Sequence, residues 1–148
     1  MNENIDWNGL ILKFVNYCNS VGVQVCFKRG CEDQYDSDYQ TIQINNQRIK
    51  KNQFFILLHE YGHHQIFQNK RLNKKFSSIA ERDVGNTLSE QVLAIEEEFL
   101  AWHFGEEAAH NLGIDLSIHE TYQTLKAKCL KSHIQSYKKV TNNKEEYI

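Results

Sequence analysis

The stretch FFILLHEYGHHQIF (Phe54–Phe67) is an apolar segment that contains two histidines four residues apart. Helical periodicity extends from the asparagines at 45 and 46 to about Gln68, which predicts a helix that includes the whole stretch. Each residue of a helix advances about 100°, so His59 and His63 project within about 40° of each other. Two imidazoles on one face can bind one metal ion, and zinc takes such ligands tetrahedrally. The alternative is a helix that contains these histidines by chance.

Glu60 directly follows the first histidine and completes the pattern His-Glu-x-x-His. A carboxylate in that position lies beside a zinc-activated water, where it can act as general base. A buried helix with two unpaired histidines and an acid is costly without a metal. We therefore expect His59 and His63 to bind zinc and Glu60 to be the catalytic base. Gly62 would allow another backbone to approach closely, and His64 points about 100° away from His63, which favours a surface or supporting position over ligation.

A third ligand must come from elsewhere, because no histidine follows in the spacing His-x-x-Gly-x-x-His. Three consecutive glutamates, Glu96, Glu97 and Glu98, lie in the middle of a second predicted helix. On a helical wheel Glu98 falls in the middle of an apolar surface, where a carboxylate is expected only if it is paired or coordinated. Glu98 is therefore the predicted ligand, and Glu96 and Glu97 are predicted to be solvated acids. That surface comprises Leu88, Val92, Ile95, Phe99 and Trp102, with the small residues Ala94, Ala101, Gly105 and Ala109 on one side.

Glu98-x-x-Ala101-Trp102 downstream of the His-Glu-x-x-His motif resembles the gluzincin metallopeptidases, and most closely the small ImmA/IrrE-type peptidases of phages and mobile elements. The resemblance covers roughly residues 23–112. It implies a minimal α+β zincin fold, in which a short antiparallel sheet packs on an active-site helix, a glutamate-bearing helix and flanking helices. It also implies that His59, His63 and Glu98 hold Zn²⁺ and that Glu60 is the base. Trp102 departs from the family, which often has asparagine there.

The remaining elements follow from periodicity and capping signals. A first helix is predicted from about Trp7 to a stop at Gly22, and alternating residues in VGVQVCFKRG and DYQTIQIN predict two strands joined as an antiparallel hairpin across the polar loop CEDQYDSD. Residues 69–86 read as a connection with one short helical turn. Capping boxes at Thr87 and Ser117 predict helices that end at Gly113 and near Val140, respectively.

Composition sets the broad class of the protein. The chain has 148 residues, of which 41% are hydrophobic, and this predicts a single domain over 1–148 with a frayed tail at 141–148. A net charge of −2 favours neither nucleic acid nor membrane, and the basic stretches Lys70–Lys75 and Lys126–Lys144 are interpreted as solvated faces. The N-terminus lacks the features of a signal peptide and no apolar segment is long enough to span a bilayer, so we expect a cytoplasmic location, in the host cytoplasm if the protein is phage-encoded.

The remaining cysteine, tyrosine, histidine and aromatic side chains are not predicted to bind the metal through the main site. The cysteines are expected to be reduced thiols, with a bridge or second metal site between Cys26 and Cys31 as the alternative. Tyr61 and Tyr122 are the phenols that could stabilise an oxyanion, although no spacing places either one. The remaining histidines, His103, His110, His119 and His133, are predicted to be surface or packing residues, and the aromatic residues Phe99, Trp102 and Phe104 are predicted to lie in the core.

The function predicted from these features is a zinc metallopeptidase whose substrate, a peptide or a protein such as a regulator, lies along the strand TIQIN (41–45). One alternative is a non-catalytic, zinc-stabilised binding module that sequesters a protein partner. The other is a metal-free helical interaction protein, which would lose no stability on chelation. The oligomeric state is left open.

Overall fold

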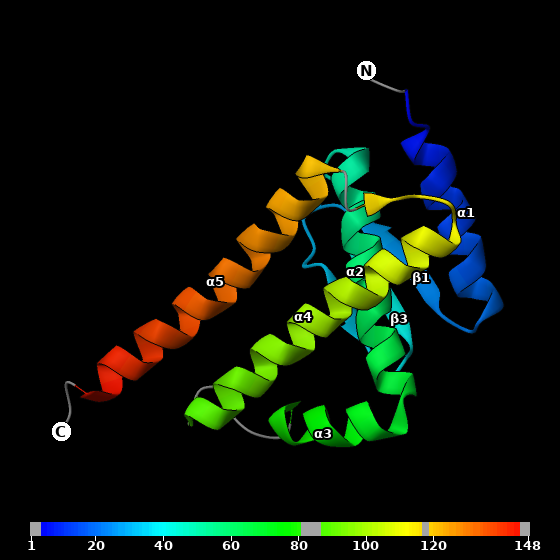
Figure 1. The fold of residues 1–148 in the computed structure, drawn as a ribbon. Helices are drawn as coiled ribbons and strands as arrows, with labels where there is room; N and C mark the ends of the chain where they lie inside the picture. The colour runs from blue at the N-terminus through cyan, green and yellow to red at the C-terminus, as the bar shows by residue number, and fades with distance from the viewer. Residues whose placement is uncertain (1–3, 81–86, 117–118, 146–148) are drawn as a thin grey trace.

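The computed structural model describes residues 4–80, 87–116 and 119–145. The described residues form five α-helices and three β-strands, which makes the fold α+β (Figure 1). In chain order these are α1 (Trp7–Ser20), β1 (Gln24–Lys28), β2 (Gln34–Asp36), β3 (Thr41–Asn45), α2 (Lys50–Gln68), α3 (Lys70–Ala80), α4 (Leu88–Asn111) and α5 (Glu120–Glu145).

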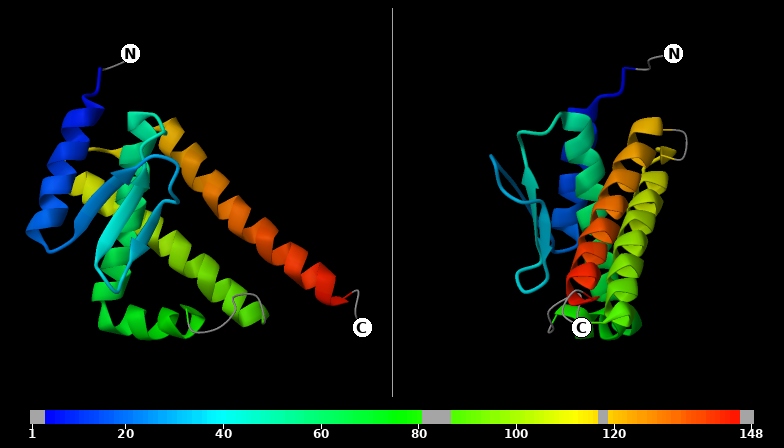
Figure 2. Two further views of the ribbon diagram at one scale, coloured as in Figure 1. Left: turned by 180° about the vertical axis from the view of Figure 1, so that it is seen from behind. Right: turned by 90° about the vertical axis from the view of Figure 1, so that its left-hand side faces the viewer.

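Helix α2 is the central element of the fold. The sheet packs on one side of α2, and α4 crosses α2 on the other side (Figure 2). The apolar run that precedes the first histidine explains this position, since residues 53–62 are buried without interruption. A helix that is buried all round needs neighbours on every face, which here are the sheet, α1 and α4. The His-Glu-x-x-His motif therefore lies inside the molecule.

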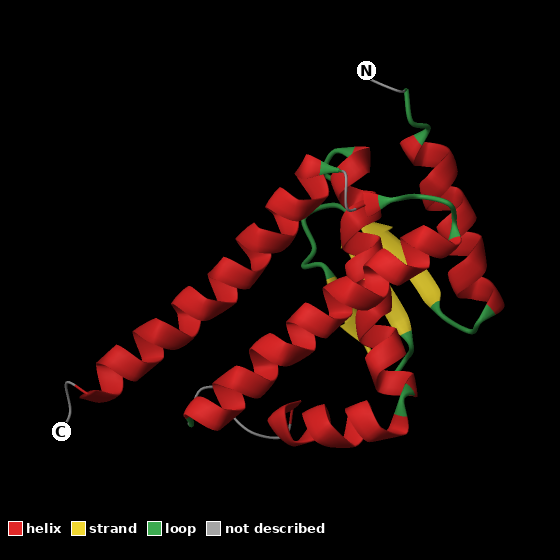
Figure 3. Cartoon of the chain, in the orientation of Figure 1, coloured by secondary structure: helices red, strands yellow, loops and turns green. Residues whose placement is uncertain are grey.

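The sheet differs from the predicted antiparallel hairpin. β1 and β3 pair in parallel, with Val25 opposite Ile42 and Phe27 opposite Ile44. β2, which lies within the predicted polar loop, pairs antiparallel with β3, so the strand order is β1-β3-β2 (Figure 3). Residues 29–40 are long enough for the crossover that a parallel pair requires. The predicted hairpin was wrong because a strand of three mostly polar residues carries too little alternation to be recognised.

This strand order also overturns the predicted substrate strand. β3 has a neighbour on both sides, so its main-chain groups are used within the sheet. Ile42 and Ile44 are fully buried against α2, as their alternation predicted. The free edges of the sheet belong to β1 and β2.

Two glycines bring α2 and α4 into backbone contact. A Cβ added to Gly62 would lie 1.9 Å from the carbonyl oxygen of Ala101, and one added to Gly105 would lie 2.9 Å from that of Leu58. Real Cβ atoms essentially never approach this closely, so a side chain at either position would push the opposing backbone away, and much further at Gly62 than at Gly105. The predicted close approach at Gly62 is confirmed, and it sets the separation of the two helices that carry the candidate ligands.

The face that α4 buries is narrower than predicted. Its small residues Ala94, Ala101, Gly105 and Ala109 are buried together with Trp102, as expected. Leu88, Val92 and Phe99 on the predicted apolar surface are exposed, so the prediction that Phe99 lies in the core was wrong. A close helix contact through small residues covers only a narrow strip of α4. Leu88, Val92 and Phe99 lie outside that strip.

Most helix ends follow their predicted signals. The Oγ1 atom of Thr87 accepts a hydrogen bond from the backbone N–H of Glu90, as the capping box predicted, and α4 ends immediately before Leu112 and Gly113. Gly22 and Gly113 have φ values of 84° and 80°, which suit residues that follow a helix. The other predicted capping residue, Ser117, lies outside the described residues.

One connection and one helix end differ from prediction. The connection after α2 contains a full helix, α3, in place of a short turn. The final helix continues beyond the predicted end near Val140 to Glu145, and residues 146–148 of the predicted frayed tail lie outside the described residues. No helix in the described part of the chain combines the length and apolar character needed to cross a membrane. All four cysteines are free, so Cys26 and Cys31 form no bridge.

Candidate metal centre

The structure brings His59 and His63 of α2 to Glu98 of α4. The Nε2 atoms of the two histidines lie 3.1 Å apart. One carboxylate oxygen of Glu98 lies 3.0 Å from Nε2 of His59, and the other lies 3.3 Å from Nε2 of His63. Among the described residues this is the only group of three or more metal-ligating side chains whose donor atoms converge in this way. The helical wheel therefore selected the glutamate that lies at the histidine pair.

The spacing of the three donor atoms suits a small tetrahedral ion. A zinc ion with bonds of about 2.0–2.2 Å holds its donor atoms roughly 3.3 Å apart. The two Nε2 atoms lie 3.1 Å apart, and each lies close to that distance from one oxygen of Glu98, 3.0 Å from His59 to Oε2 and 3.3 Å from His63 to Oε1. One ligand atom from each of the three side chains lies within 4.8 Å of the other two. Two imidazole nitrogens and one carboxylate oxygen also match the donors of catalytic zinc sites, which keep a fourth position open. The group can therefore hold a metal ion with little rearrangement.

Glu97 is closer to the site than the sequence predicted. Its Oε1 atom lies 3.6 Å from Nδ1 of His63, the ring nitrogen that faces away from the donor triangle. A carboxylate behind a histidine ligand fixes the ring orientation and makes the ligand more basic. The prediction that Glu97 is an ordinary solvated acid was therefore wrong, because the close contact of α2 with α4 brings two consecutive glutamates to His63. Glu96 does face solvent, and its carboxylate pairs with Lys75 at 2.5 Å.

Trp102 packs against the other histidine ligand. The ring centroids of Trp102 and His59 lie 4.3 Å apart with an interplanar angle of 65°, and Trp102 is buried. Its indole N–H has no hydrogen-bond partner among the described residues. The side chain therefore supports His59 by edge contact and excludes water from it, where an asparagine could have formed a hydrogen bond.

Glu60 is a buried carboxylate whose surroundings favour the protonated form. It is 8% exposed, and burial raises its pKa to about 7, with a smaller contribution from the negative charge of Glu98. His63 and a hydrogen bond from the backbone N–H of Tyr35 act in the opposite direction. A carboxyl group with a pKa near neutrality can both accept and return a proton, which is the property a general base requires.

The candidate ligands polarise one another strongly. Burial raises the pKa of Glu98, but the hydrogen bond and charge of His63 outweigh burial and bring that pKa to about 2. Burial likewise opposes the charge of His63, yet Glu97 and Glu98 hold its pKa well above the ordinary value. Burial and the charge of His63 lower the pKa of His59 to about 3. The two carboxylates thus favour a proton on His63, and that proton must leave before the imidazole can bind a metal.

Helix α5 adds two side chains that the sequence did not assign to the site. Nε2 of His133 lies 3.8 Å from Oε2 of Glu98, and the side chain is 40% exposed. Cys129, one turn earlier on α5, also feels the charge of Glu98, although burial is the main reason that its pKa is raised. Their spacing of four residues is a signal that both face the same way, but nothing in the sequence shows that α5 packs over the site.

The other predicted candidates lie away from the donor atoms. His64 is buried, and its Nδ1 shares a hydrogen bond with the Tyr35 hydroxyl at 2.8 Å. The hydroxyl of Tyr122 donates to the backbone oxygen of Trp102 and is buried, and the hydroxyl of Tyr61 is engaged with Tyr17 and Gln65. The remaining histidines match the prediction, since His103 and His110 are exposed and His119 packs against Trp7.

Comparison with protein-family models, curated proteins and solved structures found no match to the chain. The assignment of function therefore depends on the geometry of the site.

Proposed function

We propose that the protein is a zinc-dependent peptidase of the gluzincin type, close to the ImmA/IrrE-type peptidases that its two motifs resemble. The observation that carries the proposal is the convergence of His59, His63 and Glu98, which each offer one ligand atom within 4.8 Å of the other two. Glu60 supports it, because a buried carboxyl group with a pKa raised to about 7 directly follows the first ligand. A strongly shifted pKa in a buried carboxyl group is common at functional sites, which favours a catalytic role for Glu60 over a structural one.

In this proposal the chain supplies binding and proton transfer. His59, His63 and Glu98 hold the ion, and Glu97 and Trp102 keep the two imidazole rings in place. When bound, zinc polarises the scissile carbonyl and lowers the pKa of the attacking water. Glu60 accepts the proton of that water and then delivers it to the nitrogen of the leaving amine. Peptide hydrolysis needs both transfers, and a group with a pKa near neutrality performs both without a large free-energy cost.

The substrate backbone is proposed to pair with β2, since β3 lies in the middle of the sheet. β2 is an edge strand, and the backbone N–H of its residue Tyr35 reaches the carboxylate of Glu60. A free strand edge offers main-chain groups to an extended peptide. A peptide on this edge would have its backbone beside Glu60, and the strand would orient the scissile bond.

Replacing the proposed base tests this function. Glu60→Gln keeps the size of the side chain but cannot accept the proton, so we expect hydrolysis of unfolded β-casein to stop while one zinc ion per chain remains bound. Mass spectrometry of the digest and elemental analysis of the protein give the two readouts. Glu96→Gln is the matched control, because this exposed glutamate lies on α4 and outside the donor triangle, and it should leave hydrolysis unchanged. Full proteolysis by purified Glu60→Gln protein would falsify the proposal.

A second candidate, a zinc-stabilised binding module, is favoured by the position of His133. A third imidazole, 3.8 Å from Glu98, would close the site if it moved onto the ion as a fourth ligand. Cobalt substitution separates the two functions, because the visible spectrum of Co²⁺ reports its ligands. If His133→Gln leaves the spectrum and the metal affinity unchanged, the fourth position is open and the peptidase is supported. A changed spectrum, together with no hydrolysis by the native protein, supports the binding module.

A further inference from the structure

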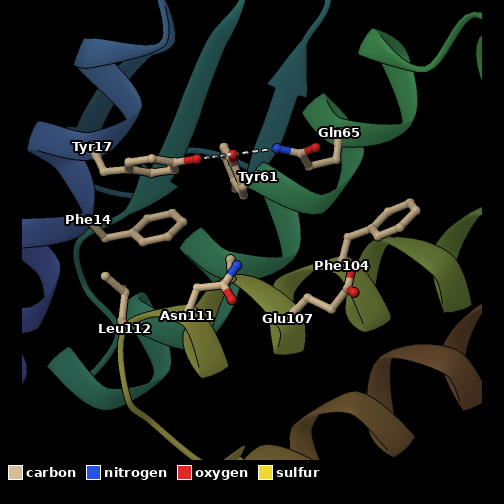
Figure 4. Close-up of a pocket in the computed structure, with 9 residues that line it drawn as sticks. Phe14, Tyr17, Tyr61, Gln65, Phe104, Glu107, Asn111 and Leu112 are labelled. Atoms are coloured by element: carbon tan, nitrogen blue, oxygen red, sulfur yellow. Dashed lines mark hydrogen bonds between the residues drawn. The ribbon is translucent and has the colours of Figure 1, made fainter.

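A cavity of about 470 Å³ lies between α1, α2 and α4 (Figure 4). Its volume falls within the range of roughly 300–1,000 Å³ that is usual for small-molecule sites. The aromatic part of its wall comprises Phe14, Tyr17, Tyr61 and Phe104. Glu107 and Asn111 of α4 also line it, and both are exposed, so the cavity opens to solvent. It is large enough to admit a ligand side chain or a small molecule.

The cavity is separate from the candidate metal centre. Tyr61 and Gln65 line it from α2, and each lies two residues along the chain from a histidine of the donor triangle. Two residues of a helix correspond to a rotation of about 200°, so these side chains leave α2 on the side opposite the ligands. The peptidase proposed above makes no use of this cavity.

Hydrogen bonds and ring contacts hold the aromatic wall in place. The hydroxyls of Tyr17 and Tyr61 lie 3.1 Å apart, and the Gln65 side-chain amide donates to the Tyr61 hydroxyl. The Phe14 and Tyr61 ring centroids are 5.1 Å apart at an angle of 90°. Figure 4 shows Tyr17 and Tyr61 joined in this network beside Phe14. A wall fixed in this way loses little conformational entropy when a ligand binds.

The charge at the cavity is negative. Glu107 is the single ionised group among the residues that line it, and no lysine or arginine in the described part of the chain forms an ion pair with it. The faces of aromatic rings carry negative potential and attract cations. A carboxylate next to several aromatic rings therefore favours a positively charged organic group, and it repels an anion of the same size.

We propose that this cavity binds an organic cation, an alkylguanidinium or alkylammonium group. Its alkyl part would contact Phe14 and Phe104, and its charged end would meet the tyrosine rings and the Glu107 carboxylate. Guanidinium fits best, because it is planar, weakly hydrated and able to stack on an aromatic ring while it donates to a carboxylate. The cation can be a free small molecule or the side chain of an arginine or lysine in a polypeptide.

Titration with matched probes tests the charge requirement. Butylguanidinium and butylurea have nearly the same shape and differ in charge, and pentanoate supplies an anion. We expect butylguanidinium to shift NMR signals of Tyr61, Gln65 and Asn111 and to bind about tenfold more tightly than butylurea, with no binding of pentanoate. Equal affinity for butylguanidinium and butylurea would overturn the proposal, and so would shifts confined to residues elsewhere in the molecule.

Variants test the location. Glu107→Gln removes an exposed charge without affecting the core, and it should weaken butylguanidinium about tenfold while butylurea binding stays the same. Tyr17→Leu keeps apolar surface but removes a ring face, and it should act in the same direction. Glu96→Gln removes the same charge from α4 at a distance from the cavity and is the matched control. Unchanged butylguanidinium affinity in folded Glu107→Gln protein contradicts the assignment.

A titration with short peptides distinguishes the two sources of the cation. Acetyl-Gly-Arg-Gly-amide is compared with the same peptide containing citrulline, which is neutral. Selective binding of the arginine peptide supports a polypeptide partner, whereas binding of butylguanidinium with exclusion of both peptides supports a free small molecule. If neither butylguanidinium nor the arginine peptide binds, the cavity is not a cation site.

Discussion

At the scale of single residues, Glu96, Glu97 and Glu98 show how adjacent positions acquire different chemistry. Glu98 reaches both histidine ligands, Glu97 lies behind one of them, and Glu96 pairs with Lys75 in solvent. Side chains that are neighbours in sequence diverge by about 100° on a helix. The packing of α4 therefore decides which carboxylate reaches the histidines and which one faces solvent. Glutamine variants at these three positions can therefore be compared directly.

Glu97→Gln is expected to weaken zinc binding about 10–100-fold, because the charge behind His63 is lost while its shape remains. Competition with a chromophoric chelator measures the affinity. Glu96→Gln should change the affinity by less than about twofold, since an exposed ion pair contributes little. Equal losses in the two variants would show that Glu97 acts only through the general charge of α4.

At the scale of elements, the contact between α2 and α4 determines whether the ligands can meet. The histidines belong to one helix and Glu98 to the other, so the separation of the helix axes sets the distances within the donor triangle. Gly62 and Gly105 permit that separation, and each lies against backbone of the opposite helix. The distance between α2 and α4 thus depends on two glycines that do not bind the metal.

Gly62→Ala should destabilise the protein by about 1–3 kcal/mol and should also weaken zinc binding, because backbone atoms 1.9 Å from the new Cβ must move. Gly105→Ala brings its Cβ to 2.9 Å, a smaller overlap that a gain in helix propensity of about 1 kcal/mol largely offsets. Urea denaturation and zinc titration measure the losses of stability and of zinc affinity in both variants, and both losses should be larger for Gly62→Ala. A Gly105→Ala protein as strongly destabilised as Gly62→Ala would contradict the expected difference between the two contacts.

The same elements show how far the sequence predicts the structure. His59, Glu60 and His63 could be placed because helical spacing is local, and Glu98 because the apolar surface around it is unusual for an acid. The position of β2 could not be predicted, since Gln34–Asp36 is too short and polar to show a period. Phe99 was misplaced because a wheel shows which residues share a face and not which part of that face a neighbouring helix covers. His133 depends on the packing of α5, which no local pattern encodes.

At the scale of the whole molecule, the site joins distant parts of the chain. α2 supplies two ligands and the base, α4 supplies the third ligand, β2 contacts the base and α5 brings His133 beside Glu98. An ion bound here would bridge α2 and α4 across the connection through α3. Metal binding should therefore stabilise the fold, since the unfolded chain cannot hold these ligands together.

Zinc at about 100 times its dissociation constant should add about 2.7 kcal/mol to the free energy of unfolding, which raises Tm by roughly 5–10 °C in a chain of this size. Differential scanning calorimetry with zinc, and again after EDTA, measures the shift. Glu98→Gln is the control, because it retains the two histidines and should lose most of the increase. A Tm that is indifferent to both zinc and EDTA would support a metal-free interaction protein.

The backbone contact at Gly62 has a practical consequence. Because the donor atoms are divided between two helices, the zinc affinity depends on the distance between α2 and α4. A change in zinc affinity therefore reports a change in that distance. Substitutions anywhere in the protein can be ranked by metal affinity alone, and those that shift the helices will stand out even when the melting temperature is unchanged. Such a map would locate the regions that hold the helix pair in register before any substrate is known.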